Sequence, residues 1–421
     1  MVNDKKWDVI VIGGGPAGLA AAVSAHDNGA KTCIIEREER LGGILKQCIH
    51  DGFGLVKFEE KLTGPEYALR FIQMVKERNI PVFLNSFLID LKKQADGFNL
   101  TLVNSKEAVF SLSSAAIVLA MGCRERTSRQ IFIHGDRPAG VITAGLAQYF
   151  INIQGYMPTK KCVILGSGDI GLIMARRLTL EGAEVEGVYE VLPEPSGLTR
   201  NIVQCLEDYK IPLHLNTTVT RIYGKNRVQG VTVSQVKDFK PLPGTERYIE
   251  CDALILSVGL IPENDIIEPL HVAMDRNTRG PCVDQNMMTL VDGMFSCGNC
   301  LHVNDLVDYV SESGEIAGAH AAQYAQNRAR KRNLVPLKKT GDLLYVVPQH
   351  LDLTAQNQAT IYFRSDRVYK TAALGIYSDG TDYLSKKYRI VKPPEMKRVV
   401  LDLSKLPSDT KEVSIELKGT R

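Results

Sequence analysis

The sequence predicts an α/β fold in which two Rossmann-like domains, the first interrupted by the second, precede a small all-β domain. A glycine-rich signature occurs twice along the chain. Each copy follows an apolar strand, opens a helix and is followed by a strand that ends in a glutamate. From about residue 342 the pattern changes to short alternating strands separated by turns.

The first signature consists of Gly13, Gly15 and Gly18. It follows the apolar run 7–12 and opens an Ala-rich helix over 16–26, and Glu36 closes the next strand. Glycine is required because the backbone must turn tightly and approach a pyrophosphate at the positive end of the helix. The Glu36 carboxylate is placed to accept hydrogen bonds from a ribose.

The second signature consists of Gly166, Gly168 and Gly171, with Asp169 and Ile170 before the last glycine. It follows the strand 161–165, opens a helix through Leu180, and leads to a strand that ends at Glu190. One such signature is weak, since it can be an ordinary glycine-rich turn without a ligand. Two copies in full context predict that the chain binds two dinucleotides.

Matching strand–glycine strings place the domain boundaries. Residues 115–122 and 251–262 are apolar strands that end in a glycine region, and each closes one nucleotide domain. Residues 292–299 then lead into a helix over 311–326, so the first domain resumes after the second. The expected division is 1–150 and 264–330 for the first domain, 151–263 for the second and 342–421 for the β domain.

Composition excludes several classes of protein. With 44% apolar and 24% charged residues and a net charge of +3, the chain has no surface suited to nucleic acid or membrane, and no segment reaches transmembrane length. Nine cysteines without framework spacing fit a reducing compartment, so we expect a cytoplasmic protein. The basic cluster at 328–332, together with Lys338 and Lys339, is interpreted as a solvated linker. No metal site is expected.

The order of these motifs over residues 1 to about 327 resembles the pyridine-nucleotide-dependent flavoproteins of the glutathione and thioredoxin reductase superfamily. Four shorter strings, at 41–54, 122–126, 139–144 and 305–308, are similar to a narrower group. This group comprises FAD/NAD oxidoreductases associated with glycerol-3-phosphate dehydrogenase in anaerobic bacteria. The strings are also similar to FAD/NAD-binding subunits of multi-subunit amino-acid and amine dehydrogenases.

The resemblance implies that the first site holds FAD, that the inserted domain holds NAD(H), and that hydride passes between nicotinamide and flavin. The residues it implies at FAD are Gly13, Gly15, Pro16, Ala17, Gly18, Glu36, Arg37, Gly42, Gly43, Leu88, Gly122, Gly298 and Asn299. Those it implies at NAD(H) are Gly166, Gly168, Asp169, Ile170, Gly171, Glu190 and Gly259. No Arg or Lys follows Glu190 before Arg200, so we expect NADH to be preferred over NADPH.

The chain departs from the resembled family at the ribityl position and at the redox disulfide. Asn299 stands where the family usually has an Asp that bonds the ribityl chain, and an amide oxygen still accepts such a bond. The disulfide positions of thioredoxin reductases read Ala144 and Ala147 here. Those of glutathione reductase relatives read Leu45 and His50. We therefore expect no redox disulfide at either position.

Two other cysteine features have alternative interpretations. Cys297 and Cys300 are either a dithiol beside the ribityl chain or, as we favour, small residues lining the turn. Cys48, with His50 two residues away, is either a flavin-facing redox or acid–base site, or a packed thiol beside a satisfied histidine. Both residues of this second pair are taken as candidate catalytic residues.

Six short strands are expected in the C-terminal β domain, at 343–347, 359–363, 372–377, 388–391, 398–402 and 413–417. The domain carries no catalytic constellation. Docking to a partner or to the chain's own flavin domains is the expected use, and structural covering is the alternative.

The sequence thus predicts an oligomeric FAD-dependent oxidoreductase that exchanges hydride with NAD(H) and electrons with a partner protein or the subunits of a larger dehydrogenase. The resemblance points to glycerol-3-phosphate metabolism. One alternative is a stand-alone NADH oxidase or peroxidase that uses Cys48. The other is a non-catalytic nucleotide-sensing scaffold.

Overall fold

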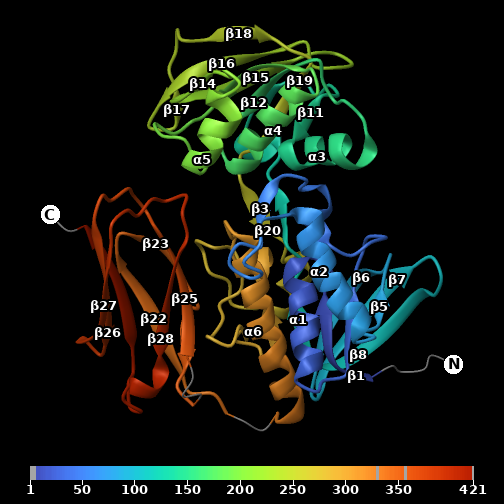
Figure 1. Ribbon diagram of the computed structural model, residues 1–421, viewed down its shortest axis with the longest axis vertical. Helices are drawn as coiled ribbons and strands as arrows, with labels where there is room; N and C mark the ends of the chain where they lie inside the picture. The colour runs from blue at the N-terminus through green and yellow to red at the C-terminus, as the bar shows by residue number, and fades with distance from the viewer. Residues whose placement is uncertain (1–5, 329–330, 355–357, 420–421) are drawn as a thin grey trace. The chain divides into compact units, whose positions relative to one another are not determined.

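The computed structural model describes residues 6–328, 331–354 and 358–419, and it confirms the predicted α/β class with two Rossmann-like sheets and additional β sheets (Figure 1). The chain forms two compact units. Arg124–Ile261 is the inserted unit, and the rest of the described chain forms the main unit.

A seven-stranded sheet lies at the centre of the main unit. Its strands are β1 Lys6–Ile12, β2 Thr32–Ile35, β5 Val82–Phe83, β6 Phe87–Gln94, β7 Gly97–Asn104, β8 Ala108–Leu119 and β21 Met294–Ser296. Their order is β5-β2-β1-β8-β7-β6, with β21 paired to β8. Neighbours among β5, β2, β1, β8 and β21 run parallel, whereas β6, β7 and the first half of β8 form an antiparallel meander.

Both faces of the parallel part of this sheet are buried. Its helices are α1 Pro16–Asp27, α2 Gly64–Glu77 and α6 Val307–Gln326. Val9 and Val11 of β1 pack in the core that contains these helices, while Ile10 and Ile12 pack in a second core with β7. This two-sided burial explains why the strands appear in the sequence as continuous apolar runs.

Short elements connect this sheet to its helices. They are the 3₁₀ turns η1 Gly43–Gln47, η5 Asp265–Leu270 and η6 Gly298–Cys300, and the strand pair β3 Asp51–Phe53 and β4 Leu62–Thr63. Helix α2 begins with a capping box in which Thr63 and Glu66 exchange hydrogen bonds. The Gly64 N–H at the start of α2 also donates to the Cys48 carbonyl at 2.9 Å, which attaches this end of the helix to the segment 43–48.

The inserted unit contains a parallel and an antiparallel sheet. The parallel strands are β11 Val141–Thr143, β12 Lys161–Leu165, β13 Glu184–Tyr189, β14 Leu213–His214 and β19 Ala253–Leu256, in the order β11-β19-β12-β13-β14. The antiparallel sheet has the order β10-β15-β16-β17, with β18 beside β16. Its strands are β10 His134–Gly135, β15 Thr217–Tyr223, β16 Gly230–Lys237, β17 Lys240–Pro241 and β18 Arg247–Glu250.

Helices cover one face of the parallel sheet of the inserted unit, and the antiparallel sheet covers the other. The helical elements are α3 Ala144–Tyr149, η3 Phe150–Gln154, α4 Asp169–Leu180, α5 Thr199–Ile202 and η4 Val203–Glu207, with the turn η2 Ser128–Ile131. Two further strands, β9 Cys123–Glu125 and β20 Leu260–Pro262, pair with each other. The unit begins at Arg124, before the boundary of 150/151 inferred from the sequence, because β11 pairs with β19 and α3 packs in the same core as α4.

The C-terminal part of the main unit is all β. Its elements are β22 Leu334–Gly341, β23 Leu343–Val347, β24 His350–Asp352, β25 Gln358–Ser365, β26 Ala372–Ser378, β27 Thr381–Tyr388, β28 Lys397–Asp402, η7 Leu403–Lys405 and β29 Val413–Gly419. They form a five-stranded sheet, β24-β22-β29-β26-β27, and a three-stranded sheet, β23-β25-β28, around a shared core.

The strand expected at 388–391 is not a strand in the structure. The chain instead returns along β26 as β27, which ends at Tyr388. Most side chains of β27 are exposed or half-buried, so its sequence lacks the apolar alternation that marks the other strands.

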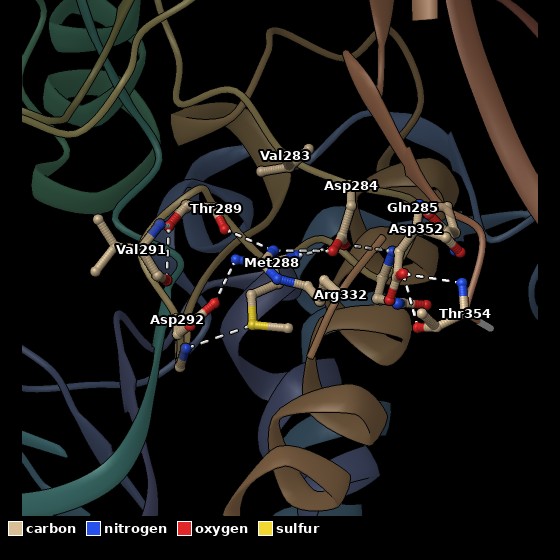
Figure 2. Close-up of polar contacts among 12 residues, drawn as sticks. Val283, Asp284, Gln285, Met288, Thr289, Val291, Asp292, Arg332, Asp352 and Thr354 are labelled. Atoms are coloured by element: carbon tan, nitrogen blue, oxygen red, sulfur yellow. Dashed lines mark hydrogen bonds and ion pairs between the residues drawn. The ribbon is translucent and has the colours of Figure 1, made fainter. Parts of the chain in front are cut away.

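The prediction of a solvated linker is wrong for Arg332, whose side chain is 9% exposed. It is also wrong for Lys338 and Lys339, which are exposed but belong to strand β22. Residues 329–330 lie outside the described part. The Arg332 guanidinium donates to the Asp284 carboxylate at 3.0 Å, to the Thr289 carbonyl at 2.9 Å and to Asp292 (Figure 2). Burial raises the pKa of Asp284, and the adjacent Arg332 opposes that rise. A basic residue read as solvated therefore attaches the start of the C-terminal part to the segment 284–292.

Candidate cofactor sites

The three signature glycines of the turn between β1 and α1 have different structural roles. Gly13 has a φ of +108°, and a Cβ there would lie 2.4 Å from the Ala120 carbonyl oxygen. A Cβ at Gly18 would lie 1.8 Å from the Gly13 carbonyl oxygen, so this glycine lets the helix pack on the turn. A Cβ at Gly15 would meet nothing closer than the Gly43 Cα at 3.8 Å. The turn therefore leaves its backbone open at Gly15, as a pyrophosphate requires.

Glu36 lies beside this turn as the sequence predicts, and its side chain is buried. One carboxylate oxygen accepts the Gly14 N–H at 2.7 Å, and the other accepts the Glu38 N–H at 2.8 Å. Each oxygen keeps a lone pair for a ligand hydroxyl. Arg37 follows it in an exposed position, and Leu88 is half-buried on β6.

The segment 42–43 closes against the same turn. The Gly42 N–H donates to the Gly14 carbonyl at 2.8 Å, and a Cβ at Gly43 would lie 2.9 Å from the Gly15 Cα. Pro16 and Ala17 occupy the first turn of α1. The structure thus brings Glu36 and the segment 42–43 against the first glycine turn, whereas no contact of Arg37 or Leu88 with this turn is shown within the described part of the chain.

The second part of this site is formed where β21 leads into η6. A Cβ at Gly298 would lie 2.7 Å from the Ala17 Cβ, so the two parts meet there. The Gly298 N–H donates to the Ser313 hydroxyl at 2.9 Å, a contact from α6 that the sequence did not indicate. Nothing lies within 4 Å of the position that a Cβ would take at Gly122.

Asn299 is bound more tightly by the protein than the sequence suggests. Its side-chain oxygen accepts both the backbone N–H of Asn304 at 3.1 Å and the side-chain amide of Asn304 at 3.3 Å. Its amide nitrogen lies 3.7 Å from the Cys123 sulfur. The Asn304 side-chain oxygen is buried without a hydrogen-bond partner among the described residues. A buried acceptor beside Asn299 fits a ligand hydroxyl that completes the site.

The second glycine turn repeats the geometry of the first. Gly166 has a φ of +97°, and a Cβ there would lie 2.1 Å from the Ser257 carbonyl oxygen. A Cβ at Gly171 would lie 2.7 Å from the Gly166 carbonyl oxygen, whereas one at Gly168 would meet nothing closer than 3.5 Å. Again the middle glycine is the open one. Ile170 is half-buried in α4.

Two acidic residues organise the loop beyond this turn. Asp169 accepts the Leu198 N–H at 2.8 Å and the Asn201 side-chain amide at 2.7 Å. Glu190, which is 4% exposed, accepts four hydrogen bonds. The donors are the Ser167 N–H at 3.0 Å, the Ser167 hydroxyl at 2.5 Å, the Ser196 hydroxyl at 3.0 Å and the Leu192 N–H at 3.0 Å. The two serines were not indicated by the sequence. Gly259 lies in the same unit.

The candidate catalytic residues lie between η1 and β3. Cys48 is 8% exposed, its thiol donates to the Ile44 carbonyl at 3.3 Å, and burial raises its pKa to about 12. The Nδ1 atom of His50 lies 3.2 Å from the Asp51 carbonyl oxygen, and its ring centroid lies 4.9 Å from that of Phe53. At neutral pH Cys48 is therefore a thiol and not the nucleophilic thiolate.

Cys297 and Cys300 are both fully buried, and burial raises the pKa of each thiol. The Cys300 sulfur lies 3.1 Å from the Leu119 carbonyl oxygen and 3.1 Å from the Cys297 carbonyl oxygen. Such contacts suit packed thiols. Among residues 6–328, 331–354 and 358–419, no cluster of side chains could ligate a metal ion, and no helix is long and apolar enough to span a bilayer.

The model of the pyridine nucleotide-disulphide oxidoreductase family matches residues 7–343. The chain belongs to this family. Proteins of the family are oxidoreductases that bind FAD and NAD(P)H, and the two open glycine turns fit these two dinucleotides.

Several characterised proteins are similar to this chain. Hydrogen cyanide synthase subunit HcnB of Pseudomonas protegens is 28% identical, and the alignment covers 62% of this chain and 58% of HcnB. NADH dehydrogenase of Bacillus subtilis is 29% identical over 71% of this chain and 54% of that enzyme. The chain thus spans little more than half the length of these relatives.

Solved structures share the fold of this chain. Thioredoxin reductase of Lactococcus lactis superimposes with a TM-score of 0.62 at 19% identity, covering 76% of this chain and 99% of that structure. The T. acidophilum thioredoxin reductase gives a TM-score of 0.60 at 21% identity, covering 77% and 100%. Neither alignment extends over the whole of this chain.

Proposed function

We propose that this protein is the flavin component of a larger dehydrogenase, exchanging hydride with NADH and passing electrons to a partner protein or subunit. When bound, FAD supplies the chemistry that connects a two-electron nicotinamide donor with other acceptors. The chain supplies a pyrophosphate turn and a ribose acceptor for each dinucleotide, through Gly15 with Glu36 and through Gly168 with Glu190.

The protonation of Cys48 is the observation that favours a protein as electron acceptor over a small substrate such as peroxide. A peroxidase needs a thiolate that attacks peroxide, and the buried Cys48 thiol, with a pKa of about 12, is protonated at neutral pH. The standard disulfide positions hold Ala144 and Ala147, and Leu45 and His50. Electrons leaving the flavin therefore have no thiol relay at these positions, which favours direct transfer to another protein.

The similarity to HcnB, which is named as a subunit, supports a multi-subunit assembly. We further propose that the partner is a cytoplasmic dehydrogenase of the glycerol-3-phosphate type, on the basis of the motifs at 41–54 and 305–308. Co-purification from the native cell, followed by a glycerol-3-phosphate-dependent reduction assay of the complex, tests this partner. A complex that oxidises only amino acids or amines contradicts it.

The main test compares acceptors under anaerobic conditions. We expect NADH to bleach the bound flavin, and the reduced protein to reduce artificial electron acceptors rapidly and peroxide slowly. Cys48→Ser is expected to leave NADH-dependent bleaching within about twofold, because a neutral thiol and a hydroxyl differ little at neutral pH. Cys282→Ser, at a half-buried cysteine outside the site, is the matched control.

Rapid peroxide turnover that disappears in Cys48→Ser would instead identify an NADH peroxidase. Stoichiometric FAD that NADH does not bleach would identify a nucleotide-sensing scaffold. Either result contradicts the electron-transfer role.

A further inference from the structure

The central strand of the three-stranded sheet β23-β25-β28 packs against a core on each face. Ile361 and Phe363 of β25 point into the core of the C-terminal part, whereas Tyr362 between them belongs to the core of α1 and α6. Along β23, Val346 and Tyr345 divide in the same way. The C-terminal part therefore shares a core with the predicted flavin domain.

Arg364, at the end of β25, is the polar centre of this contact. Its side chain is 12% exposed and pairs with the Asp305 carboxylate. It also donates hydrogen bonds to the Tyr345 hydroxyl at 2.9 Å and to the carbonyls of Val303 at 3.4 Å, Pro393 at 3.0 Å and Pro394 at 2.6 Å. The second Asp305 oxygen accepts the Met396 N–H at 2.6 Å. The fork of Arg364 thus joins three segments of the C-terminal part to the loop 303–305.

A second ion pair involves Glu312 within α6, whereas Asp305 lies just before this helix. Arg398 of β28 donates through Nε and a terminal nitrogen to the two oxygens of Glu312, and the Tyr362 hydroxyl donates to the same carboxylate at 2.5 Å. The two ion pairs bracket residues 305–312, which include the N-terminus of α6.

The loop held by Arg364 is the one that orients Asn299. Asn304, the neighbour of Asp305, donates two hydrogen bonds to the Asn299 side-chain oxygen. The Asn304 side chain also donates to the His302 carbonyl at 2.8 Å. A displacement of Asp305 therefore changes the direction of the Asn304 donors and, with them, the Asn299 amide.

We propose that the C-terminal part is a component of the flavin site and that Arg364 is a positioning residue for FAD. Arg364 fixes Asp305, Asp305 fixes Asn304, and Asn304 orients Asn299 at the ribityl position. This inference rests on the FAD site of the proposed function. It gives the C-terminal strands a role in FAD binding that acts through the loop 303–305.

The test titrates apoprotein with FAD and records the dissociation constant, the flavin absorption spectrum and the apoprotein Tm. Arg364→Met is expected to weaken FAD binding roughly tenfold and to shift the flavin spectrum, because Asp305 loses its charged partner. Arg364→Lys keeps the charge but not the fork, and an intermediate effect is expected.

Two control variants separate positioning from general destabilisation. Arg398→Met removes the other ion pair of the same contact and is expected to lower the Tm without the spectral shift. Arg367→Met, at a side chain 60% exposed, is expected to change neither. Equal FAD affinity and equal spectra for Arg364→Met and Arg398→Met overturn the positioning role.

A double-mutant cycle tests the route through Asn299. If Arg364 acts through this amide, the effects of Arg364→Met and Asn299→Ala on the FAD dissociation constant are less than additive. Full additivity overturns the route. If wild-type protein binds FAD but NADH does not reduce the bound flavin, the proposed function is contradicted. The positioning role of Arg364 is unaffected by that result.

Discussion

Glu36 and Glu190 occupy equivalent positions after β2 and β13, but the protein binds their carboxylates differently. Glu36 accepts one backbone N–H at each oxygen, whereas three of the four donors to Glu190 share a single oxygen. The loop that follows Glu190 adds the exposed Glu194 and contributes no cation before Arg200. This loop therefore adds a carboxylate and no cation near the place where we expect the two nicotinamide dinucleotides to differ.

This charge predicts a preference for NADH. Two unit charges 4 Å apart repel by roughly 1–4 kcal/mol at effective dielectric constants of 80 to 20, so a 2′-phosphate near Glu190 is disfavoured. We expect kcat/KM for flavin reduction to be at least about tenfold higher with NADH than with NADPH. Glu190→Gln is expected to narrow this ratio more than Glu194→Gln does. Comparable efficiency of the two nucleotides with wild-type protein contradicts the assignment.

At the scale of the element, different glycines of each turn serve folding and ligand binding. The outer glycines of each turn approach backbone oxygen atoms, where a side chain has no room. A Cβ at the middle glycines would make only ordinary van der Waals contacts, at 3.8 Å for Gly15 and 3.5 Å for Gly168. A methyl group at the outer positions therefore disturbs the fold, whereas one at the middle positions disturbs the ligand.

We expect Gly15→Ala and Gly168→Ala to fold with an apoprotein Tm close to that of the wild type. Gly15→Ala is expected to lose most FAD affinity, and Gly168→Ala to retain FAD but to need a higher NADH concentration for half-maximal bleaching. Gly18→Ala is the contrasting variant, because its Cβ would lie 1.8 Å from the Gly13 oxygen, and it is expected to lower the Tm. Loss of FAD from Gly168→Ala would show that the two sites are assigned in the wrong order.

For the molecule as a whole, the contact between α6 and the C-terminal strands contains a buried histidine. His302 is 1% exposed, and neither ring nitrogen has a hydrogen-bond partner among the described residues. Its ring centroid lies 5.8 Å from that of Tyr345 and 5.5 Å from that of Tyr362. Burial, and then the nearby Arg364, lower the pKa of His302 to about 3.

This pKa predicts that the folded state loses stability in acid. The unfolded chain binds a proton at His302 near pH 6.5 and the folded chain does not, so the contribution is complete above pH 6.5 and is lost as the pH falls towards 3. The slope approaches about 1.4 kcal/mol per pH unit for one such group. The free energy of unfolding, measured with urea between pH 6.5 and 4.5, should depend less steeply on pH in His302→Phe than in the wild type. His134→Gln, at an exposed histidine, should show the same pH dependence as the wild type. An unchanged slope in His302→Phe would falsify the assignment.

Local sequence patterns determined the two nucleotide turns, because a pyrophosphate turn needs glycines and a carboxylate at fixed spacing along one strand–helix–strand segment. Gly13 to Gly18, Glu36 and the second set therefore lie where they were expected. Five of the six strands expected in the C-terminal part correspond to β23, β25, β26, β28 and β29, whereas β22, β24 and β27 were not predicted. Most residues of β27 are exposed or half-buried and carry no apolar period.

Contacts between residues distant in sequence were decided only by the tertiary structure. Ser313 binds Gly298, Asn304 binds Asn299, and Arg364 binds Asp305, and no local period signals such pairs. The protonation of Cys48 likewise depends on its burial, which the neighbouring residues in the sequence do not indicate. Arg332 was predicted to be solvated because it lies in a run of basic residues, and the sequence does not show which acidic residue pairs with it. In the folded chain it pairs with Asp284. Sequence spacing therefore located the turns, while tertiary packing set the charge and orientation of the groups around them.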